Sequence, residues 1–324
     1  MKRHAKLFAL LISLWYLPQA ASAAETLIPV GQVIGLELQE DRVIVAAFDD
    51  ALGAEAEAAG LQVGDEILSI DGLTVDTAAD VQKALAHSKG IVSIHVLREG
   101  QEQIFRVSPQ ITADGPRLGI YLRQGVTGIG TVTWFDPDSG RFGALGHGVN
   151  NSDGALVEMT GGSVFRAKVQ SVKRGKVGQP GQLVGTVTDP DPIGELEKNT
   201  VQGVFGACGS GWAGTELPVC DAASVQTGPA VIRSTVSGDA TREYSVEILK
   251  IYPGSREDGR NMLIRVTDPA LLAATGGIVQ GMSGSPLVQD GKLIGAVTHV
   301  LVNDPTMGYG IFIENMLEAA EGGD

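Results

Sequence analysis

The chain has 324 residues, enough for two domains of ordinary size, and 43% of them are hydrophobic while only 5% are aromatic. The formal net charge is −14, and such an acidic surface repels nucleic acid and anionic lipid, so neither is expected as a partner. The 44 glycines, together with abundant valine, isoleucine and threonine, favour many short strands and turns over a helix bundle.

The N-terminal segment has the layout of a secretory signal peptide. A basic start, an apolar core and a small-residue cleavage site follow one another at 2–6, 7–17 and 21–23. We expect export across the cytoplasmic membrane with cleavage after Ala23, which removes three of the 24 basic residues and leaves a net charge of −17. Because the uncharged run at 7–24 is 18 residues long, an uncleaved membrane anchor is the alternative.

Residues 31–108 have the pattern of a small α+β domain. The predicted strands lie at 33–38, 42–48, 91–97 and 102–108, and Asp76 is the expected N-cap of a helix at 76–88. Between these elements, the segment A-G-L-Q-V-G-D-E-I-L-S-I-D-G at 59–72 resembles a PDZ domain.

PDZ domains bind peptide tails by adding a strand to a sheet edge beside a helix. The resemblance implies a groove between residues 35–38 and the helix at 76–88. The backbone amides around Ile34, Gly35 and Leu36 are expected to receive a terminal carboxylate. A structural spacer with an empty groove is the alternative.

After a Pro- and Gly-containing linker at 109–117, the pattern changes to short strands with turn signals. Residues 128–149 predict a hairpin that ends at His147, and the one good amphipathic helix lies at 313–323. The chain is therefore expected to be mostly β, with the PDZ domain followed by an all-β domain at 118–324, either a pair of barrels or a sandwich.

Cys208 and Cys220 are the only cysteines. In an exported protein they are compatible with a disulfide, and an unlinked buried pair is the equal alternative. Two thiols do not complete a structural zinc site, and the sequence offers no other metal-ligand cluster, so no cofactor is expected.

The stretch G-M-S-G-S-P at 281–286 matches the G-x-S-G-x-P loop of chymotrypsin-like peptidases, in which the middle serine attacks the substrate. This register makes Ser283 the expected nucleophile. Gly281 and Gly284 let the loop curl, so the amides of Gly281 and Ser283 are expected to hold the oxyanion. Such a domain has a chymotrypsin-like double β-barrel.

A serine nucleophile needs a base, and histidine is the usual choice. Of the five histidines, His147 lies between two glycines after a strand, which suits an exposed imidazole. His299 lies in a β-branched strand beyond the serine loop, where it is expected to border the specificity pocket. We therefore favour His147 as the base over His299.

Asp268, fifteen residues before Ser283, is the best candidate for the acid that orients the base. Asp189 and Asp191 are weaker alternatives. An aspartate that precedes a proline commonly only caps a turn or helix, so a purely structural role of Asp268 stays open.

Two segments, G-R-F-G-A-L-G-H-G-V at 140–149 and the block from V-T-D at 266 to N-M-L at 317, resemble the SpoIVB serine peptidase family. The resemblance places the catalytic triad on Ser283, His147 and Asp268. It also implies a peptidase that acts between the mother-cell and forespore membranes of a spore former. Such an enzyme cleaves itself and then a membrane-associated regulator, which leads to sigma-factor activation, and its PDZ domain binds protein tails.

The chain departs from that family in one respect that bears on function. Here the PDZ unit begins almost at the predicted cleavage site, whereas the family has an anchor and a longer preceding segment. The alternative function is a non-catalytic PDZ scaffold with a peptidase-like domain. An esterase is disfavoured, because the chain lacks a G-x-S-x-G elbow.

Overall fold

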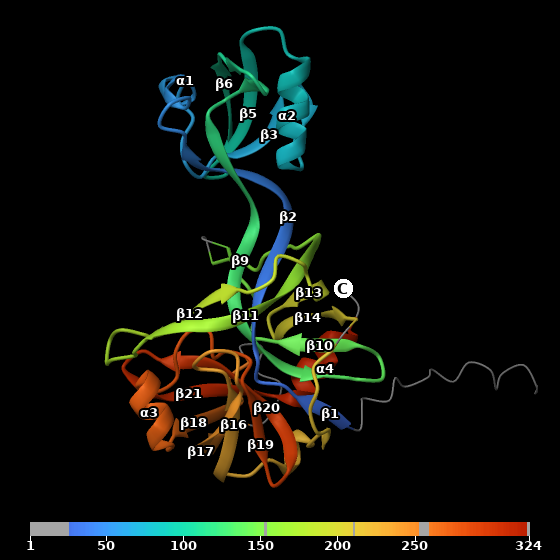
Figure 1. Ribbon diagram of the computed structural model, residues 1–324, viewed down its shortest axis with the longest axis vertical. Helices are drawn as coiled ribbons and strands as arrows, with labels where there is room; N and C mark the ends of the chain where they lie inside the picture. The colour runs from blue at the N-terminus through green and yellow to red at the C-terminus, as the bar shows by residue number, and fades with distance from the viewer. Residues whose placement is uncertain (1–25, 152–153, 210, 253–258, 323–324) are drawn as a thin grey trace, which may run out of the picture.

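The computed structural model describes residues 26–151, 154–209, 211–252 and 259–322, so the predicted signal peptide lies outside the described residues. These residues form a lower body of two β-barrels and a small upper unit (Figure 1). Two long strands, β2 (Val33–Phe48) and β9 (Ile120–Phe135), run from one to the other. In the described ranges, no helix is both long and apolar enough to span a bilayer.

The first barrel is a ring of six strands around an apolar core. Strand β2 pairs with β11 on one edge and with β9 on the other, which closes the ring β9-β10-β14-β13-β11-β2. The remaining members are β10 (Arg141–Ala144), β11 (Gly161–Lys173), β13 (Gly194–Thr200) and β14 (Gly203–Cys208). Short strands β1 (Thr26–Pro29), β12 (Gln182–Val187) and β15 (Leu217–Pro218) extend the sheet.

The second barrel closes in the order β16-β17-β18-β21-β20-β19. Its strands are β16 (Gly228–Ser234), β17 (Arg242–Ile251), β18 (Met262–Val266), β19 (Pro286–Gln289), β20 (Lys292–Leu301) and β21 (Asp304–Phe312). Along β17 the buried Tyr244, Val246 and Ile248 alternate with exposed residues, as expected for a strand with one face in a core. A 3-10 turn, Ala222–Ser224, precedes this barrel.

Two helices accompany the second barrel. Helix α3 (Pro269–Thr275) follows β18, and helix α4 (Ile313–Glu321) follows β21. The buried face of α4 packs with Trp134 and Phe205 of the first barrel and with Leu293 and Ile311 of the second. This shared apolar cluster fixes the two barrels against each other, because separating them would expose it to water.

The small unit contains β3 (Glu66–Ile70), β4 (Leu73–Thr74), β5 (Val92–Arg98), β6 (Gln101–Val107), α1 (Ala54–Ala58) and α2 (Ala78–His87). Helix α2 begins one residue later than predicted. Its N-cap is Thr77, not Asp76, because Thr77 and Asp80 form a reciprocal capping box. The apolar stripe Val81, Ala84 and Leu85 is buried against the sheet.

The structure corrects the predicted boundaries of this unit. The segments predicted as strands at 33–38 and 42–48 are one continuous strand, β2, whose first half belongs to the first barrel. The small unit is therefore inserted into that barrel between β2 and β9. The predicted linker at 109–117 instead forms a hairpin of β7 (Gln110–Thr112) and β8 (Gly115–Arg117).

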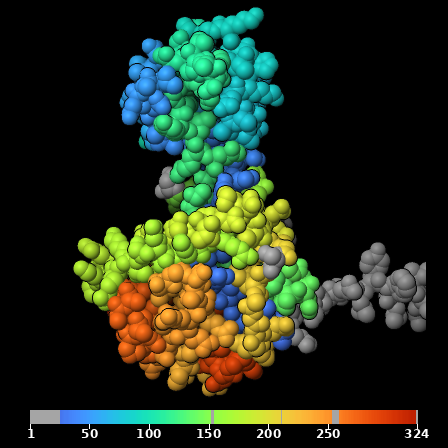
Figure 2. Space-filling model, in the orientation of Figure 1, coloured from blue at the N-terminus to red at the C-terminus, as the bar shows by residue number. Residues whose placement is uncertain are grey.

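A narrow waist joins the inserted unit to the barrels (Figure 2). Gly125 has a φ of +86° there, and a Cβ at this position would lie 1.8 Å from the carbonyl oxygen of Leu38. Only glycine fits so close an approach of β9 to β2. The predicted fold class, mostly β with a small α+β unit and a double β-barrel, is confirmed.

Candidate active site

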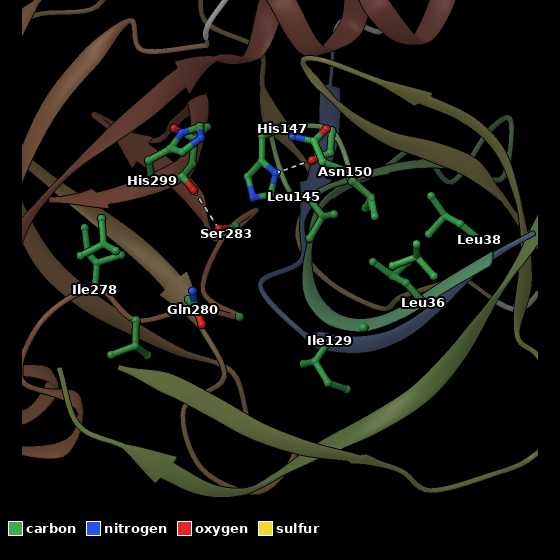
Figure 3. A pocket seen from close by; sticks show the side chains of 18 residues that line it. Leu36, Leu38, Ile129, Leu145, His147, Asn150, Ile278, Gln280, Ser283 and His299 are labelled. Carbon is green, nitrogen blue, oxygen red and sulfur yellow. Dashed lines mark hydrogen bonds between the residues drawn. The ribbon is translucent and has the colours of Figure 1, made fainter. Parts of the chain in front are cut away.

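A cavity of about 510 Å³ lies between the two barrels and contains the predicted catalytic loop (Figure 3). The first barrel lines it with Leu36, Leu38, Val126, Ile129, Leu145 and Val149, and the second with Ile278, Val279 and Val300. Ser283, His147 and His299 face this space. The structure thus brings together residues that are up to 152 positions apart in the sequence (His147 to His299).

Ser283 lies at the tip of a tight loop between α3 and β19. Gly281 and Gly284 have φ values of +94° and +93°, which a side chain would rarely tolerate. A Cβ on Gly284 would also lie 2.0 Å from the carbonyl oxygen of Thr131. The Ser283 hydroxyl donates a 2.8 Å hydrogen bond to the carbonyl of Thr298 on β20.

His147 follows β10 on a strained turn. Leu145 and Gly146 have φ values of +69° and +68°, so the chain turns sharply just before the imidazole. Nδ1 lies 2.8 Å from the carbonyl oxygen of Gly148, which can only accept, so Nδ1 carries the proton and donates. The other nitrogen, Nε2, is then the basic one, and Figure 3 shows it turned towards the cavity beside Ser283.

Burial of the His147 ring lowers its pKa below the ordinary value of 6.5, and the hydrogen bond to Gly148 offsets part of this effect. Burial acts in this direction because it disfavours the charged imidazolium. The ring is therefore neutral at pH 7, which is the form that accepts a proton from a serine.

His299 lies on β20 directly after Thr298 and faces His147 across the cavity. The two ring centroids are 5.2 Å apart, with 40° between the ring planes. His299 lines the cavity, and its role as the border of a specificity pocket stays a prediction. Its neighbour Thr298 accepts the Ser283 hydrogen bond through the backbone, so His299 directly follows the residue that Ser283 contacts.

No hydrogen bond joins Ser283 to His147 in the described part of the chain, since the hydroxyl points to Thr298. Catalytic hydrogen bonds often form only when a substrate is bound, so this arrangement is compatible with a catalytic pair.

The backbone amides of Gly281 and Ser283 are the predicted oxyanion donors. Among backbone carbonyls of the described ranges, neither amide has a hydrogen-bond partner, whereas the amides of Met282, Gly284 and Ser285 all do. Two neighbouring unpaired donors beside a serine hydroxyl are the arrangement that stabilises a developing oxyanion.

Asp268 does not belong to this site, which corrects the predicted triad. Its Oδ1 accepts from the amides of Ala270 and Leu271 at 2.9 Å each, so its carboxylate is the N-cap of α3. His147 donates to Gly148 instead, and Asp268 is not among the residues that line the cavity. The alternatives Asp189 and Asp191 also lie away from it, in an exposed turn where Asp189 accepts from the amide of Asp191.

Two groups at the site were not predicted from the sequence. The carbonyl of Gly148 takes the place that a carboxylate would have beside Nδ1. Thr131, fully buried on β9, donates its hydroxyl to the carbonyl of Gly281 at 2.7 Å. Alternation with Val132 and Trp134 would place Thr131 on the solvent face, whereas it is fully buried, and nothing local relates it to a loop 150 residues away.

The two cysteines are free thiols, so the disulfide alternative is not realised. Cys208 donates to the carbonyl of Ile193, and burial raises the pKa of the Cys220 thiol. Among the described residues, no group of three or more His, Cys, Asp or Glu side chains is arranged to hold a metal ion.

The predicted peptide groove of the PDZ unit is also corrected. Ile34, Gly35 and Leu36 pair with β11 on one edge and with β9 on the other, so this stretch has no free edge for a peptide. A cavity of about 580 Å³ instead lies between α2 and the start of β9. Its apolar lining consists of Leu52, Val81, Leu85, Leu118, Ile120 and Leu122.

Two protein-family profiles match the chain. The profile of SpoIVB peptidase S55 matches residues 114–317, and the profile of a PDZ domain matches residues 53–98. The first covers more than half of the chain and includes the cavity residues His147, Ser283 and His299.

Three individual proteins show partial similarity to this chain. The protein mll0638 of Mesorhizobium japonicum, named as a candidate zinc metalloprotease, is 31% identical over 146 residues, which span 44% of this chain and 38% of that protein. The active form of the Rv3671c protease of M. tuberculosis has a TM-score of 0.35 and 17% identity, covering 61% of this chain and 76% of that one. A PDZ domain of an SdrC-like protein of Listeria monocytogenes has a TM-score of 0.22 and 26% identity, covering 25% of this chain and 87% of that one.

Proposed function

This chain belongs to the SpoIVB peptidase S55 family and is a serine peptidase, and we propose that Ser283 is its nucleophile and His147 its general base. The observation that carries this assignment is the shared cavity, in which the basic Nε2 of His147 is turned towards the space beside Ser283. The carbonyl of Gly148 holds the imidazole in the required tautomer, so the site works as a dyad.

In the first half of the reaction, Ser283 Oγ forms a bond to the carbonyl carbon of the scissile peptide and passes its proton to Nε2 of His147. The π electrons of the carbonyl move to its oxygen, which the amides of Gly281 and Ser283 stabilise. The carbon–nitrogen bond then breaks, and His147 returns the proton to the leaving amine. Ser283 is left as an acyl ester.

In the second half, water attacks the ester and gives one proton to Nε2 of His147. The bond between the acyl carbon and Oγ breaks, and the proton returns to Oγ. The products are regenerated Ser283 and a carboxylic acid, which releases its proton to water and becomes a carboxylate. The neutral state of His147 at pH 7 suits both halves, since each begins with a proton transfer to the ring.

For the PDZ unit, we propose that a protein tail adds as a strand to the edge of β9 that faces α2. Residues 120–124 of β9 pair only with β2, within the described residues, so their other edge is free beside the apolar cavity. Docking there would hold a protein substrate near the catalytic barrels.

The biological role we propose is that of the family which the sequence resembles. The exported enzyme cleaves itself and then a membrane-associated regulator in sporulation signalling that leads to sigma-factor activation. The predicted signal segment supports an extracytoplasmic location. Intact mass analysis of purified residues 24–324 tests self-cleavage, with fragments expected in the wild type and none in Ser283→Ala.

A fluorophosphonate probe tests the catalytic assignment directly, because it labels only an activated serine. We expect labelling of the wild type, none of Ser283→Ala, and labelling slowed by at least about 100-fold in His147→Ala. Ser285→Ala is the matched control, since Ser285 is in the same loop but is buried against Ser234. An unlabelled wild-type protein would favour the non-catalytic scaffold instead.

A further inference from the structure

The cavity beside Ser283 has a chemical character that the proposed catalysis does not use. Its walls contain nine aliphatic side chains and no Asp, Glu, Lys or Arg among the described residues. The titratable side chains in it are His147 and His299. A substrate side chain that enters this space therefore meets mostly hydrocarbon, the uncharged Asn150, Gln280 and Thr298, and no acidic or basic side chain besides the two histidines.

The two walls lie on different sides of the catalytic pair. Ile278 is on the Ser283 side, whereas Leu36 and Leu38 lie beyond His147 (Figure 3). The second-barrel wall is part of the catalytic segments themselves, since Ile278 precedes Ser283 in one loop and Val300 follows Thr298 on β20. Ile278 and Val300 line the same cavity as Gly281 and Ser283, so the wall is available to the side chain of the residue whose carbonyl Ser283 attacks.

The side chains of the second-barrel wall are held in place by packing and by backbone hydrogen bonds. Ile278 is 2% exposed, and its amide donates to the carbonyl of Pro305 at 2.8 Å. Its Cδ1 would lie 2.6 Å from a Cβ on Gly308, so the absence of a side chain at Gly308 makes room for it. Val300 completes the wall from β20 and is half-buried.

We propose, on the basis of the proposed function, that Ile278 and Val300 form the pocket for the residue on the acyl side of the scissile bond, and that they select an aliphatic side chain. A charged side chain would lose its hydration there without gaining an ion pair. That penalty corresponds to a preference of at least about 100-fold for leucine over lysine or glutamate.

Two matched aminoalkyl phosphonate diphenyl esters test this inference. One carries a leucine-like and the other a lysine-like side chain at the acyl position, and both report the rate at which Ser283 is labelled. The general fluorophosphonate is used in parallel, because it reports an activated serine whatever the pocket prefers. We expect the leucine-like probe to react at least about 100-fold faster than the lysine-like one.

Val300→Asp adds a charge to the pocket wall and should move the ratio of the two rates towards the lysine-like probe by about 100-fold or more. Val302→Asp is the matched control, since Val302 is 47% exposed and does not line the cavity. It should keep the leucine preference.

The outcomes separate the two proposals. Fluorophosphonate labelling with equal rates for the two side chains would overturn the aliphatic pocket and leave the catalytic assignment intact. A faster reaction of the lysine-like probe with the wild type would do the same. No labelling of the wild type by any probe would overturn both. If Val300→Asp does not fold, the wild-type ratio still decides the preference.

Discussion

At the scale of single residues, Thr131 holds the two catalytic loops together. Its hydroxyl donates to the carbonyl of Gly281 at 2.7 Å and its amide to the carbonyl of Ser283 at 3.2 Å. Its own carbonyl accepts from the amide of Leu145, two residues before His147, at 3.2 Å. One buried residue of the first barrel thus joins the loop of Ser283 to the loop of His147.

We expect Thr131→Val to lower kcat by about 10- to 100-fold with little change in KM, because it leaves the Gly281 carbonyl unpaired and loosens the nucleophile loop. Steady-state kinetics on one peptide measure both constants. Thr131→Ser keeps the hydroxyl and should restore most of kcat. Thr127→Val makes the same change at an exposed position of β9 and should have no effect. Failure of serine to rescue would indicate a loss of packing instead.

The pH dependence of activity belongs to the same scale. His147 must be neutral to accept the Ser283 proton, and burial lowers its pKa below 6.5. Activity should therefore persist as the pH falls through 6.5 and be lost only at a lower pH, where the ring becomes protonated. This loss of activity is the acidic limb of a plot of kcat/KM against pH, which measures it. His299→Gln removes the other titratable side chain of the cavity, and a limb that disappears with it would assign the titration to His299.

At the scale of elements, helix α3 explains why an aspartate lies fifteen residues before the nucleophile. Asp268 satisfies two amides at the start of α3, and Gly276 ends the helix with a φ of +78°. The helix leads directly into the loop of Ser283, so a well-formed α3 supports the site without contributing a catalytic group.

Asp268→Ala should reduce the free energy of unfolding by about 0.5–2 kcal/mol, as the loss of an N-cap does. At temperatures where the variant is folded, its kcat/KM should stay within a few-fold of the wild type. Asp268→Asn keeps a good N-cap and should be near neutral in both measurements. A loss of about 10⁴-fold in kcat for Asp268→Asn would show that the aspartate orients His147 after all.

At the scale of the whole molecule, the inserted unit and the catalytic barrel share two continuous strands. The first half of β2 and the second half of β9 line the active-site cavity, and their other halves belong to the PDZ sheet. Gln124 adds a link at the waist, since its side chain bonds to the backbone of Glu40, Asp76 and Ala78. The barrel core, however, does not include residues of the PDZ core.

Removing the inserted unit should therefore leave the barrels folded. Leu38 and Val126 are directly opposite partners on β2 and β9, so an Asn-Gly turn can replace residues 39–125. We expect fluorophosphonate labelling within a few-fold of the full chain, while cleavage of protein substrates that dock by their tails falls sharply. Loss of labelling in a folded variant would show instead that the PDZ unit is needed for chemistry.

Part of the fold and site is readable from local signals. Gly281 and Gly284 mark the loop of Ser283, and Gly146 marks the turn just before His147, because these backbones have left-handed φ values. The PDZ unit is readable for the same reason, from its glycine-punctuated segment at 59–72. The role of Asp268 was wrongly predicted, since an aspartate before a proline has the same local pattern whether it caps a helix or orients a base.

The sequence by itself thus determined the mostly β class, the PDZ segment, and the glycine-marked loops of Ser283 and His147, because each depends on residues close together in the chain. Only the tertiary structure decided that β2 pairs on both edges, which closes the groove expected at Ile34, Gly35 and Leu36. It alone decided that Gly148 accepts from His147 and that Thr131 joins the two loops. Strand pairing and barrel closure bring distant segments together, and the local sequence pattern does not specify which strand edges pair with each other.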